Sequence, residues 1–316
     1  MPIILDVDPG VDDALAIMFA LRTPELDVLA LSIVSGNVPV DQGVENALRL
    51  LHFLEHPQIP VFAGAERPLV REPVRAPQVH GPHGLGAVSL PPAELHANGD
   101  ALGFIIDTLK ARGEEITLVA LGPLTNLALA EAQVPGVLKK AKQIVVMGGA
   151  IRAPGNVSAL GEFNFYSDPD AARTVVRSGA NLLLVPLDVT GQVAVGREEI
   201  RRLVSTSPSA TASFFEKVTE PALSYMESLY GKPQLSLHDP VAVVAAFQPH
   251  LFEIETHWLD VQVGGELGAG QLVSDRRQFS DHGRRQGTAT ECCVGVKADL
   301  VRSHLMQTTF LTAQPA

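Results

Sequence analysis

Cysteine, aromatic residues and positive charge are all scarce in this sequence. Two of its 316 residues are cysteines, the adjacent Cys292 and Cys293, and aromatic residues make up 5%. Neighbouring cysteines rarely form a structural disulfide, so we expect buried strand thiols and a reducing, cytoplasmic compartment. Lysine and arginine number 24 against 35 acidic residues, a formal net charge of −11. This balance makes nucleic acid and anionic membranes poor partners.

Long apolar runs are missing as well. None reaches the length of a transmembrane helix. Asp6 and Asp8 interrupt the N-terminal apolar stretch in which a signal peptide would need its hydrophobic core. Hydrophobic residues still make up 46% of the chain, enough for a large folded core. Because the sequence contains no internal repeat, low-complexity segment or linker, we predict one domain over residues 1–316.

Acidic residues gather where the first predicted strand ends. Residues 3–7 form the apolar run of a buried parallel strand, and residues 14–21 show the spacing of a helix. Ligands of open α/β sheets bind beyond the carboxyl ends of the strands. Four carboxylates crowd this turn: Asp6, Asp8, Asp12 and Asp13. They repel one another unless a cation or a proton lies among them, and Ca²⁺ and Mg²⁺ take oxygen ligands from such clusters.

A purely structural interpretation explains two of these four carboxylates. Asp and Gly are common in turns, and Asp12 and Asp13 could be first-turn acids that the helix dipole favours. It does not account for Asp6 and Asp8 at the end of a buried strand. We therefore favour a metal or catalytic site at this turn.

Strands and helices alternate along most of the chain, which predicts an α/β fold. We expect a mostly parallel central sheet with helices on both faces, a Rossmann-like arrangement. Pro123 suits a first helical turn, and Asp168 suits a helix cap before Pro169, so Asp168 is given no chemical role. Strands are predicted over 26–34, 61–64, 116–121, 143–147 and 182–187, helices over 40–54, 100–112, 197–204, 210–229, 241–247 and 298–311, and further strands within 252–296.

Two other features carry polar side chains that could bind a ligand. Residues 66–98 lack periodicity and contain His80-Gly81-Pro82-His83-Gly84. A long irregular loop is usually functional or disordered, and a plain surface loop is the alternative. His238 and Asp239 open an apolar helix and add a titratable group and a further candidate metal ligand. Polar residues at the ends of other segments would suit a polyhydroxylated ligand, whose diol can chelate a hard cation: Asn37, Asn156, Glu162 and Asn164.

These segments together resemble the inosine-uridine-preferring nucleoside hydrolase family. The Asp-rich turn at residues 6–13 matches the family's N-terminal signature, and the resemblance extends over nearly the whole chain. The other matching segments, in order, are 34–37, 80–81, 121–126, 146–149, 155–156, 162–164 and 238–240. The resemblance implies the nucleoside hydrolase fold, a ribonucleoside substrate and a homodimer or homotetramer.

The resemblance also implies a Ca²⁺ ion at the floor of the pocket. Asp8, Asp13 and Asp239 match its carboxylate ligands, and the backbone carbonyl of Leu121 matches a further ligand. The family often has Thr at that last position, but a carbonyl ligand tolerates a change of side chain. One water and the 2′ and 3′ hydroxyls of ribose complete the coordination.

The remaining matches assign substrate contacts, again by resemblance. Asp12, Asn37 and Asn164 match residues that hold the ribose hydroxyls, and Asn156 and Glu162 match contacts to the 5′ hydroxyl. Met147 matches a residue that packs beneath the sugar, and Phe163 matches a further substrate-binding residue. His80 and His238 match residues near the base.

The chemistry of N-glycoside hydrolysis fits these residues. The transition state carries positive charge on the ribose and negative charge on the departing base. Asp8 is the candidate general base that activates water, and His238 is the candidate acid that protonates the base. Retention of His238 resembles the group that includes pyrimidine-preferring and nonspecific members, and the only tryptophan, Trp258, gives no aromatic sandwich for a purine. Two alternatives stay open: a haloacid-dehalogenase-like phosphatase and a non-catalytic nucleoside- or ribose-binding protein.

Overall fold

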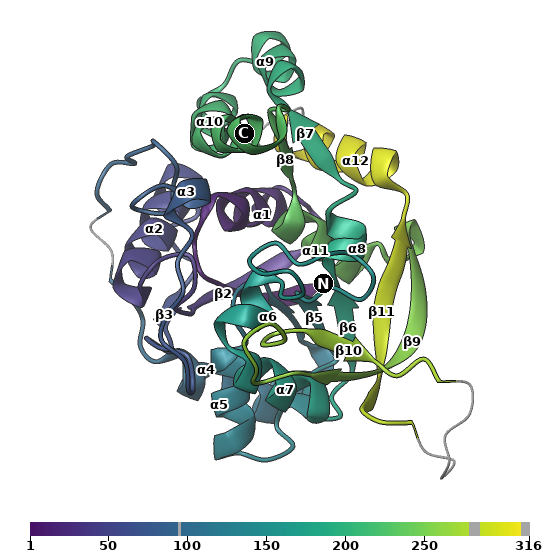
Figure 1. Ribbon diagram of the computed structural model, residues 1–316. Helices are drawn as coiled ribbons and strands as arrows, with labels where there is room; N and C mark the ends of the chain where they lie inside the picture. Colours follow the sequence, from purple (N-terminus) through teal and green to yellow (C-terminus); the bar gives the residue numbers. More distant parts are fainter. Residues whose placement is uncertain (94–95, 278–284, 311–316) are drawn as a thin grey trace.

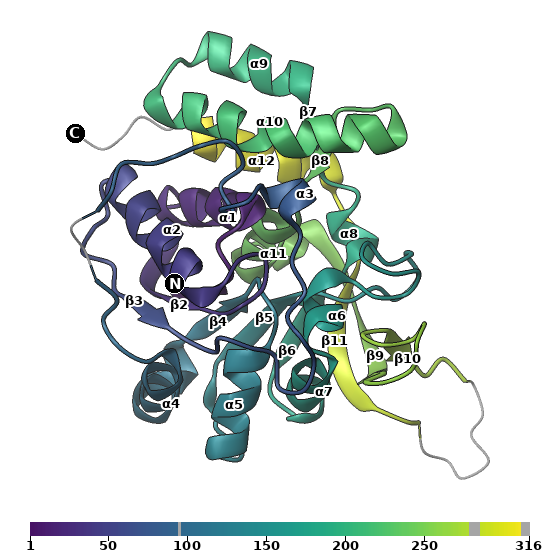
Figure 2. The same cartoon turned by 60° about the vertical axis from the view of Figure 1, so that its left-hand side comes forward.

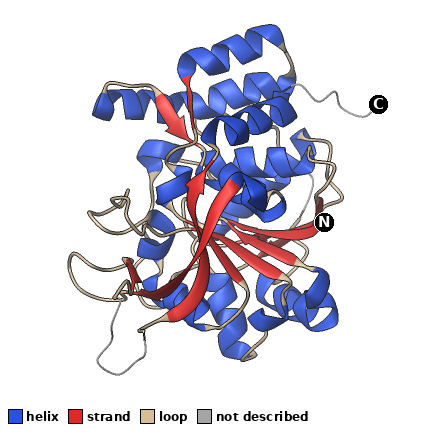
Figure 3. Ribbon diagram, turned by 90° about the vertical axis from the view of Figure 1, so that its right-hand side faces the viewer, coloured by secondary structure: helices blue, strands red, loops and turns tan. Residues whose placement is uncertain are grey.

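A nine-stranded sheet runs through the centre of the molecule (Figures 1 and 3). The computed structural model describes residues 1–93, 96–277 and 285–310. The strand order is β10-β9-β11-β6-β5-β4-β1-β2-β3, and among the described strands only β9 runs against the rest. Its strands are β1 (Pro2–Val7), β2 (Asp27–Ile33), β3 (Val61–Ala63), β4 (Thr117–Ala120), β5 (Gln143–Met147), β6 (Leu182–Val185), β9 (Phe252–Val261), β10 (Leu272–Ser274) and β11 (Thr288–Val296).

Helices cover both faces of the sheet, as predicted. Successive side chains of a strand point to opposite faces, so Ile3 and Leu5 join one hydrophobic cluster and Ile4 joins the other. On the first face lie α1 (Val11–Leu21), α2 (Val40–Phe53), α10 (Ala210–Tyr230), α11 (His238–Phe247) and α12 (Ala298–Phe310) (Figure 2). On the second face lie α4 (Ala101–Arg112), α5 (Thr125–Gln133) and α7 (Pro169–Arg177). The α/β class with a mostly parallel sheet is therefore confirmed.

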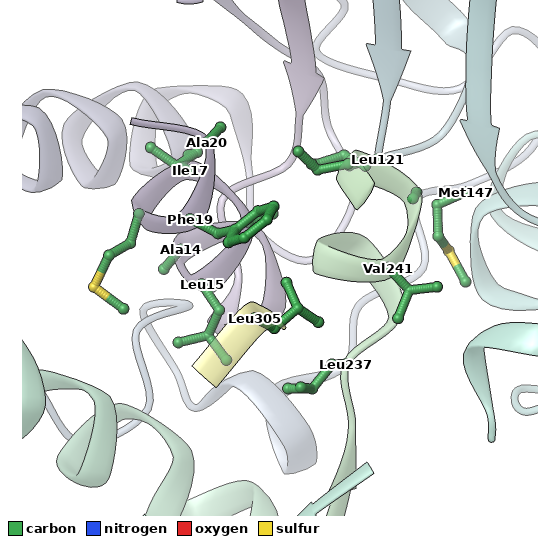
Figure 4. Packing of buried hydrophobic residues seen from close by; sticks show 14 of the residues in the cluster. Ala14, Leu15, Ile17, Phe19, Ala20, Leu121, Met147, Leu237, Val241 and Leu305 are labelled. Carbon is green, nitrogen blue, oxygen red and sulfur yellow. The ribbon is translucent and has the colours of Figure 1, made fainter. Parts of the chain in front are cut away.

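Helix α1 is apolar almost all round and is buried on every side. Figure 4 shows Leu15, Ile17 and Phe19 among Val241 of α11 and Leu305 of α12. Such a helix belongs in the core of a large protein. Its burial fixes the N-terminus of α1, and with it the two acidic residues of the first turn, against the sheet.

The order in which the chain adds strands to the sheet reverses between β1 and β4. The chain adds β2 and β3 on one side of β1, then returns to add β4, β5 and β6 on the other. This is a topological switch point, where the loops beyond neighbouring strands diverge and leave a crevice. Asp8 follows β1 and Leu121 follows β4, so the fold places both residues at this crevice.

Several boundaries differ from those that the sequence predicts. Pro123 lies before α5 rather than in its first turn, because the helix begins at Thr125. The strand expected over 182–187 stops at Val185, and a short helix, α8 (Leu187–Thr190), follows it. The end expected at Leu311 lies outside the described residues.

Short elements escape sequence patterns because they hold too few residues for a period. Elements that were not predicted are α3 (Pro77–His80), α6 (Phe163–Ser167), the antiparallel pair β7 (Ala194–Gly196) and β8 (Gln234–Ser236), and the 3₁₀ turns Gly113–Glu115, Leu138–Lys140 and Pro249–Leu251. The helix α9 (Arg197–Thr206) and α10 match their predictions closely. Cys292 and Cys293 are buried free thiols on β11, as expected. None of the described helices is both long and apolar enough to cross a membrane.

Candidate active site

The turn after β1 is held together by the side chain of Asp13. Its Oδ1 accepts the backbone N–H of Asp8 at 3.1 Å, and its Oδ2 accepts that of Gly10 at 2.9 Å. Asp13 thereby satisfies donors at the open N-terminus of α1, which is the structural role considered for a first-turn acid. The carboxylate is fully buried. It is therefore fixed in place before any ligand arrives.

The end of β2 holds the carboxylate of Asp8 from the other side. The backbone N–H of Asn37 donates to Asp8 Oδ2 at 2.6 Å, and the side-chain amide of Asn37 donates to Asp13 Oδ2 at 3.2 Å. Residue 36 must be glycine, because a Cβ there would lie 1.9 Å from Asp8 Oδ2. Two neighbouring strand ends are thus joined through these carboxylates.

Three carboxylates converge above this turn. One oxygen from each of Asp12, Asp13 and Asp239 lies within 4.8 Å of the other two. Asp13 and Asp239 belong to the predicted metal set, whereas Asp12 was assigned to a ribose hydroxyl. Asp8, the third predicted carboxylate ligand, lies beside Asp13 but outside this group of three.

The electrostatics of the cluster call for a bound cation. Burial and the charge of Asp13 raise the pKa of Asp8 well above its usual range, and burial with the charge of Asp12 does the same for the pKa of Asp239. Burial also raises the pKa values of Asp12 and Asp13. Among the described residues, no hydrogen-bond partner meets Asp8 Oδ1 or Asp12 Oδ1, and both atoms are buried. Buried oxygens of this kind fit a hard divalent ion.

Asn164 ties the ends of β4 and β5 together at the pocket floor. Its side-chain amide donates to the carbonyl of Leu121 at 2.7 Å and to that of Met147 at 3.1 Å. Leu121 O, the predicted backbone ligand, therefore faces the pocket beside Asn164. A carbonyl oxygen has two lone pairs, so this hydrogen bond leaves one available.

Glu162 caps the helix α6 from inside the protein. Its carboxylate accepts the backbone N–H groups of Asn164 and Gly149, both at 2.9 Å, and that of Phe165 at 3.2 Å. Burial outweighs these bonds and raises the pKa of Glu162 to about 7. Asn156 accepts the N–H of Phe163 at 2.9 Å. These contacts position the wall to which the 5′-hydroxyl contacts were assigned.

The ring of His80 has a defined protonation pattern. Its Nδ1 accepts the backbone N–H of Val11 at 3.1 Å, so the proton of the neutral ring sits on Nε2. Burial lowers the pKa of His80 to about 4. The 3.7 Å separation from Asp12 Oδ1 is therefore not an ion pair at neutral pH.

The glycines of the His80 loop serve the protein rather than a ligand. Gly84 has φ +89°, and a Cβ on it would lie 2.7 Å from the carbonyl of Pro9. Gly84 lets the loop dock on the Asp-rich turn, which brings His80 to the pocket.

His238 stands at the start of α11, next to Asp239. Its Nδ1 lies 2.8 Å from the hydroxyl of Thr190 on α8. Burial lowers the pKa of His238 to about 4, and the nearby ring of His80 acts in the same direction. Both imidazoles are thus neutral at rest.

A single cavity of about 530 Å³ brings the predicted residues together. Asp8 and Asp13 lie beneath its floor and do not line it. The other predicted site residues all do: Asp12, Asn37, His80, Leu121, Met147, Asn156, Glu162, Phe163, Asn164, His238 and Asp239. Asp12 and Asp239, which lie 227 positions apart in the chain, thereby share one site.

The rim of this cavity adds further residues to those of the predicted site. Arg75 donates to the carbonyl of Gly36 at 2.8 Å and to Ser35 Oγ at 2.9 Å, and it is the one Lys or Arg among the described residues that line the cavity. Apolar and aromatic side chains from the end of α10 complete the rim: Tyr225, Met226, Leu229 and Tyr230. The segments 70–86 and 222–237 both border the cavity.

A second cavity, of about 600 Å³, lies at the edge of the sheet around β9 and β10. Its acids are paired: Asp275 with Arg277, and Asp260 with Arg173 and Arg177. Hydrogen bonds from arginine lower the pKa of Asp275 and of Asp260, so both carboxylates are ionised and already neutralised by a partner. The unpaired buried carboxylates therefore assign the chemistry to the first cavity.

This arrangement defines an acidic, polar cavity at the switch point of a Rossmann-like sheet, and comparison with known proteins names the family. The model of the inosine-uridine-preferring nucleoside hydrolases matches residues 3–303. The pyrimidine-specific ribonucleoside hydrolase RihA of Escherichia coli is 38% identical over 282 residues, covering 87% of this chain and 88% of that protein. The chain belongs to the inosine-uridine-preferring nucleoside hydrolase family.

Solved structures agree with this placement. A plant nucleoside hydrolase superposes with a TM-score of 0.93 at 34% identity, covering 98% of this chain and 99% of that one. A purine-preferring ribonucleoside hydrolase from Gardnerella vaginalis has a TM-score of 0.89 at 32% identity, with 98% of each chain covered. The protein is accordingly an N-glycosidase that hydrolyses ribonucleosides. The phosphatase and the non-catalytic binding protein, which the sequence left open, are set aside.

Proposed function

We propose that this chain is a Ca²⁺-dependent hydrolase that splits ribonucleosides into ribose and free base, with Asp8 as the general base. The observation that carries the proposal is the set of buried, unpaired carboxylate oxygens at the floor of the cavity. A neutral imidazole, His238, stands on its wall. The carboxylates of the floor favour the positive charge that develops on the ribose, and His238 on the wall meets the negative charge that develops on the departing base.

Asp8 supplies the base because of its burial and its contacts. The backbone N–H of Asn37 holds one carboxylate oxygen, and the other is free of protein donors among the described residues. A free, fixed oxygen can accept a proton from water as that water attacks the anomeric carbon. General bases of this kind typically contribute about 10²–10⁴-fold in rate.

Asp8, Asp13, Asp239 and the carbonyl of Leu121 would hold the metal ion. Ca²⁺ suits all-oxygen, flexible donor sets, and when bound it would act as a Lewis acid and as a template for the ribose diol. The protein side chains do the rest. Carboxylates around the sugar favour the positive charge that grows on the ribose.

The ribose and the base occupy different walls in this proposal. Asp12, Asn37 and Asn164 hold the 2′ and 3′ hydroxyls, and Asn156 and Glu162 contact the 5′ hydroxyl. Met147 and Phe163 pack against the sugar. His80 and His238 face the base, with His238 as the acid. Because its ring is neutral at rest, it takes up a second proton before it protonates the base on departure. Their common position around one cavity supports these roles.

For the base itself, we propose a pyrimidine-preferring or nonspecific enzyme. The relative RihA is named pyrimidine-specific. In this chain the wall near the base combines the imidazoles of His80 and His238 with Tyr225 and Tyr230, while Trp258 lies on β9 and does not line the cavity. A wall without a large fused aromatic ring offers little extra stacking area to a purine.

The assay that tests the proposal measures ribose release from uridine, cytidine, inosine, adenosine and guanosine. We expect turnover that stops on chelation, returns with Ca²⁺, and is at least as fast with the pyrimidines as with the purines. Purine turnover alone would contradict the base preference but leave the hydrolase intact. Full activity in metal-free protein would contradict the role of Ca²⁺.

The wider setting is proposed on fewer observations. We propose that residues 1–316 act as one nucleoside hydrolase domain, and the match over residues 3–303 supports this. Two buried, unbridged neighbouring thiols support a reducing cytoplasmic compartment. The family resemblance supports a homodimer or homotetramer, which light scattering of the purified protein would distinguish.

A further inference from the structure

We infer that Thr190 is a positioning residue that fixes the imidazole of His238 for its encounter with the leaving base. This inference rests on the proposed function, in which His238 is the acid. Thr190 touches neither the cavity nor the proposed metal ligands by any described contact. Its only side-chain hydrogen bond among the described residues is the one to His238 Nδ1, at 2.8 Å.

The environment of Thr190 leaves its hydroxyl little freedom. Its side chain is fully buried, at 0% exposure. A buried hydroxyl that loses its partner is costly, so Thr190 and His238 hold each other in one arrangement. The ring of His238, by contrast, lines the cavity. With Nδ1 directed at Thr190, Nε2 is the nitrogen that remains for a ligand.

The direction of this hydrogen bond decides what Nε2 can do. When the Thr190 hydroxyl donates to Nδ1, the ring proton of the neutral imidazole must reside on Nε2. Nε2–H is then a donor that faces the cavity. Through this donor the neutral ring hydrogen-bonds the departing base. Full proton transfer comes from the doubly protonated ring, in which Nδ1–H donates to the Thr190 hydroxyl instead, so Thr190 keeps Nε2–H on the cavity side in both forms. The same logic already holds for His80, whose Nδ1 accepts a backbone N–H.

The backbone around the pair sets its geometry. Thr190 ends α8, and the N–H of Leu187 at the start of that helix donates to the carbonyl of Gly149 at 3.0 Å. On the other side, the N–H of Leu237 donates to the carbonyl of Val193 at 2.9 Å. Val193 lies three residues after Thr190, and Leu237 lies one residue before His238. Their hydrogen bond therefore joins the segment of Thr190 to the segment of His238. The contact between the side chains is therefore built into the fold.

Asp188 shows that α8 also supports the opposite wall. Its carboxylate accepts the N–H groups of Ile151 and Arg152, both at 2.7 Å, and that of Ala153 at 3.2 Å. These residues lead to Asn156, which was assigned to the 5′ hydroxyl. Two neighbouring side chains of one short helix thus act on two walls. Variants at Asp188 and Thr190 should consequently have different kinetic effects.

The test uses Thr190→Val, which keeps the shape of the side chain and removes its hydroxyl, together with Thr190→Ser, which restores the hydroxyl. Each is assayed for kcat and KM with uridine, whose base needs protonation, and with 4-nitrophenyl riboside, whose phenolate leaves without it. We expect Thr190→Val to lower kcat for uridine by about tenfold, as expected for a small misplacement of a catalytic group. The kcat for nitrophenyl riboside should change less than about twofold, and Thr190→Ser should restore uridine turnover.

Three further variants complete the design. Thr23→Val is the matched control, because Thr23 is also buried and, among the described residues, its hydroxyl bonds only the carbonyl of Phe19, near the end of α1 away from the site. Asp188→Asn should raise KM for both substrates more than it lowers kcat. Thr190→Val combined with His238→Ala should be no slower on uridine than His238→Ala alone, because residues that act as a unit are not additive. Melting temperatures show that each variant is folded.

Each outcome decides the inference. Equal losses on the two substrates, or losses that multiply in the double variant, would overturn it, because Thr190 would then be merely structural. So would a His238→Ala variant that is impaired equally on both substrates, because His238 would not be the acid. Failure of the proposed function is recognised separately, since the unmodified protein would then release no ribose from any nucleoside.

Discussion

The floor and the rim of the cavity are built in opposite ways. Beneath the floor, Asp8 and Asp13 are buried, at 1% and 0% exposure, and three backbone N–H groups from two segments, the turn after β1 and the loop after β2, hold them. On the rim, Leu229 and Tyr230 are exposed by 53% and 73%, and both are apolar or aromatic. The floor is rigid before a ligand binds, whereas the rim has surface left to bury.

This difference separates chemistry from substrate choice. A general base and a metal site need ligands fixed to within fractions of an ångström, and backbone hydrogen bonds at strand ends provide that. Recognition of a flat base needs area and adjustable contact, which half-exposed side chains on a helix end provide. His238 belongs between the two, because its backbone lies on the floor beside Asp239 while its ring reaches the wall.

Removing the metal should have the largest effect, since it acts on the whole floor. We expect chelation to abolish nucleoside hydrolysis and added Ca²⁺ to restore it. Because the carboxylates repel one another without a cation, Ca²⁺ should also raise the melting temperature of the metal-free protein. Both quantities are measured on one preparation with its metal content verified. Undiminished turnover at a verified absence of divalent ions would refute the metal site.

Asp8→Asn should have the next largest effect and should strike every substrate. The variant keeps the shape of the side chain and removes the base, so kcat should fall by about 10²–10⁴-fold for uridine and for 4-nitrophenyl riboside alike. Asp107→Asn, on the exposed surface of α4, is the matched control and should leave kcat unchanged. A drop of less than tenfold at position 8 would mean that another group activates the water.

His238→Ala should slow hydrolysis by a factor that depends on the leaving group, whereas Asp8→Asn should slow hydrolysis of every substrate. Uridine hydrolysis should fall by about 10²-fold or more, the lower range for loss of a general acid, while nitrophenyl riboside hydrolysis should change little. His250→Ala, at an exposed position after α11, serves as control. If both substrates slow by the same factor, the acid must be sought at His80 or Tyr230, which also line the cavity.

The smallest expected effect needs no mutation: the rim segments should change their hydrogen exchange when a ligand binds. Residues 70–86 and 222–237 border the cavity and should close over a bound nucleoside, excluding water. Hydrogen exchange in both segments should slow when a ribose-mimicking inhibitor binds, while exchange in β4 and β5 stays constant. Unchanged exchange in both rim segments would argue for a preformed, rigid pocket.

Much of the fold could be predicted from the chain, because its signals are local. The apolar run of residues 3–7 and the periodicity of residues 14–21 identify β1 and α1 without tertiary information. The elements that escaped prediction are short, such as α3 and α8, or depend on a distant partner, as β7 depends on β8. Their conformations are stabilised by contacts that local sequence does not encode.

The candidate site divides in the same way. The four carboxylates of residues 6–13 stand out in the sequence because nothing in a buried strand end explains them. Arg75 and Thr190 do not stand out: each is an ordinary residue whose hydrogen bonds reach segments far away in the chain, Gly36 for the first and His238 for the second. The position of Thr190 just past the end of β6 is the one signal that could have drawn attention to it.

By itself, then, the sequence determined the strand-turn-helix that carries Asp8 and Asp13, because hydrophobic period, turn residues and charge crowding all act over a few neighbouring positions. Only the tertiary structure decided which carboxylates converge, since Asp239 reaches Asp12 and Asp13 through the packing of α11 on α1. It also decided the protonation pattern of His80, because its Nδ1 accepts Val11 N–H, and it placed the Thr190 hydroxyl within hydrogen-bond distance of His238 Nδ1.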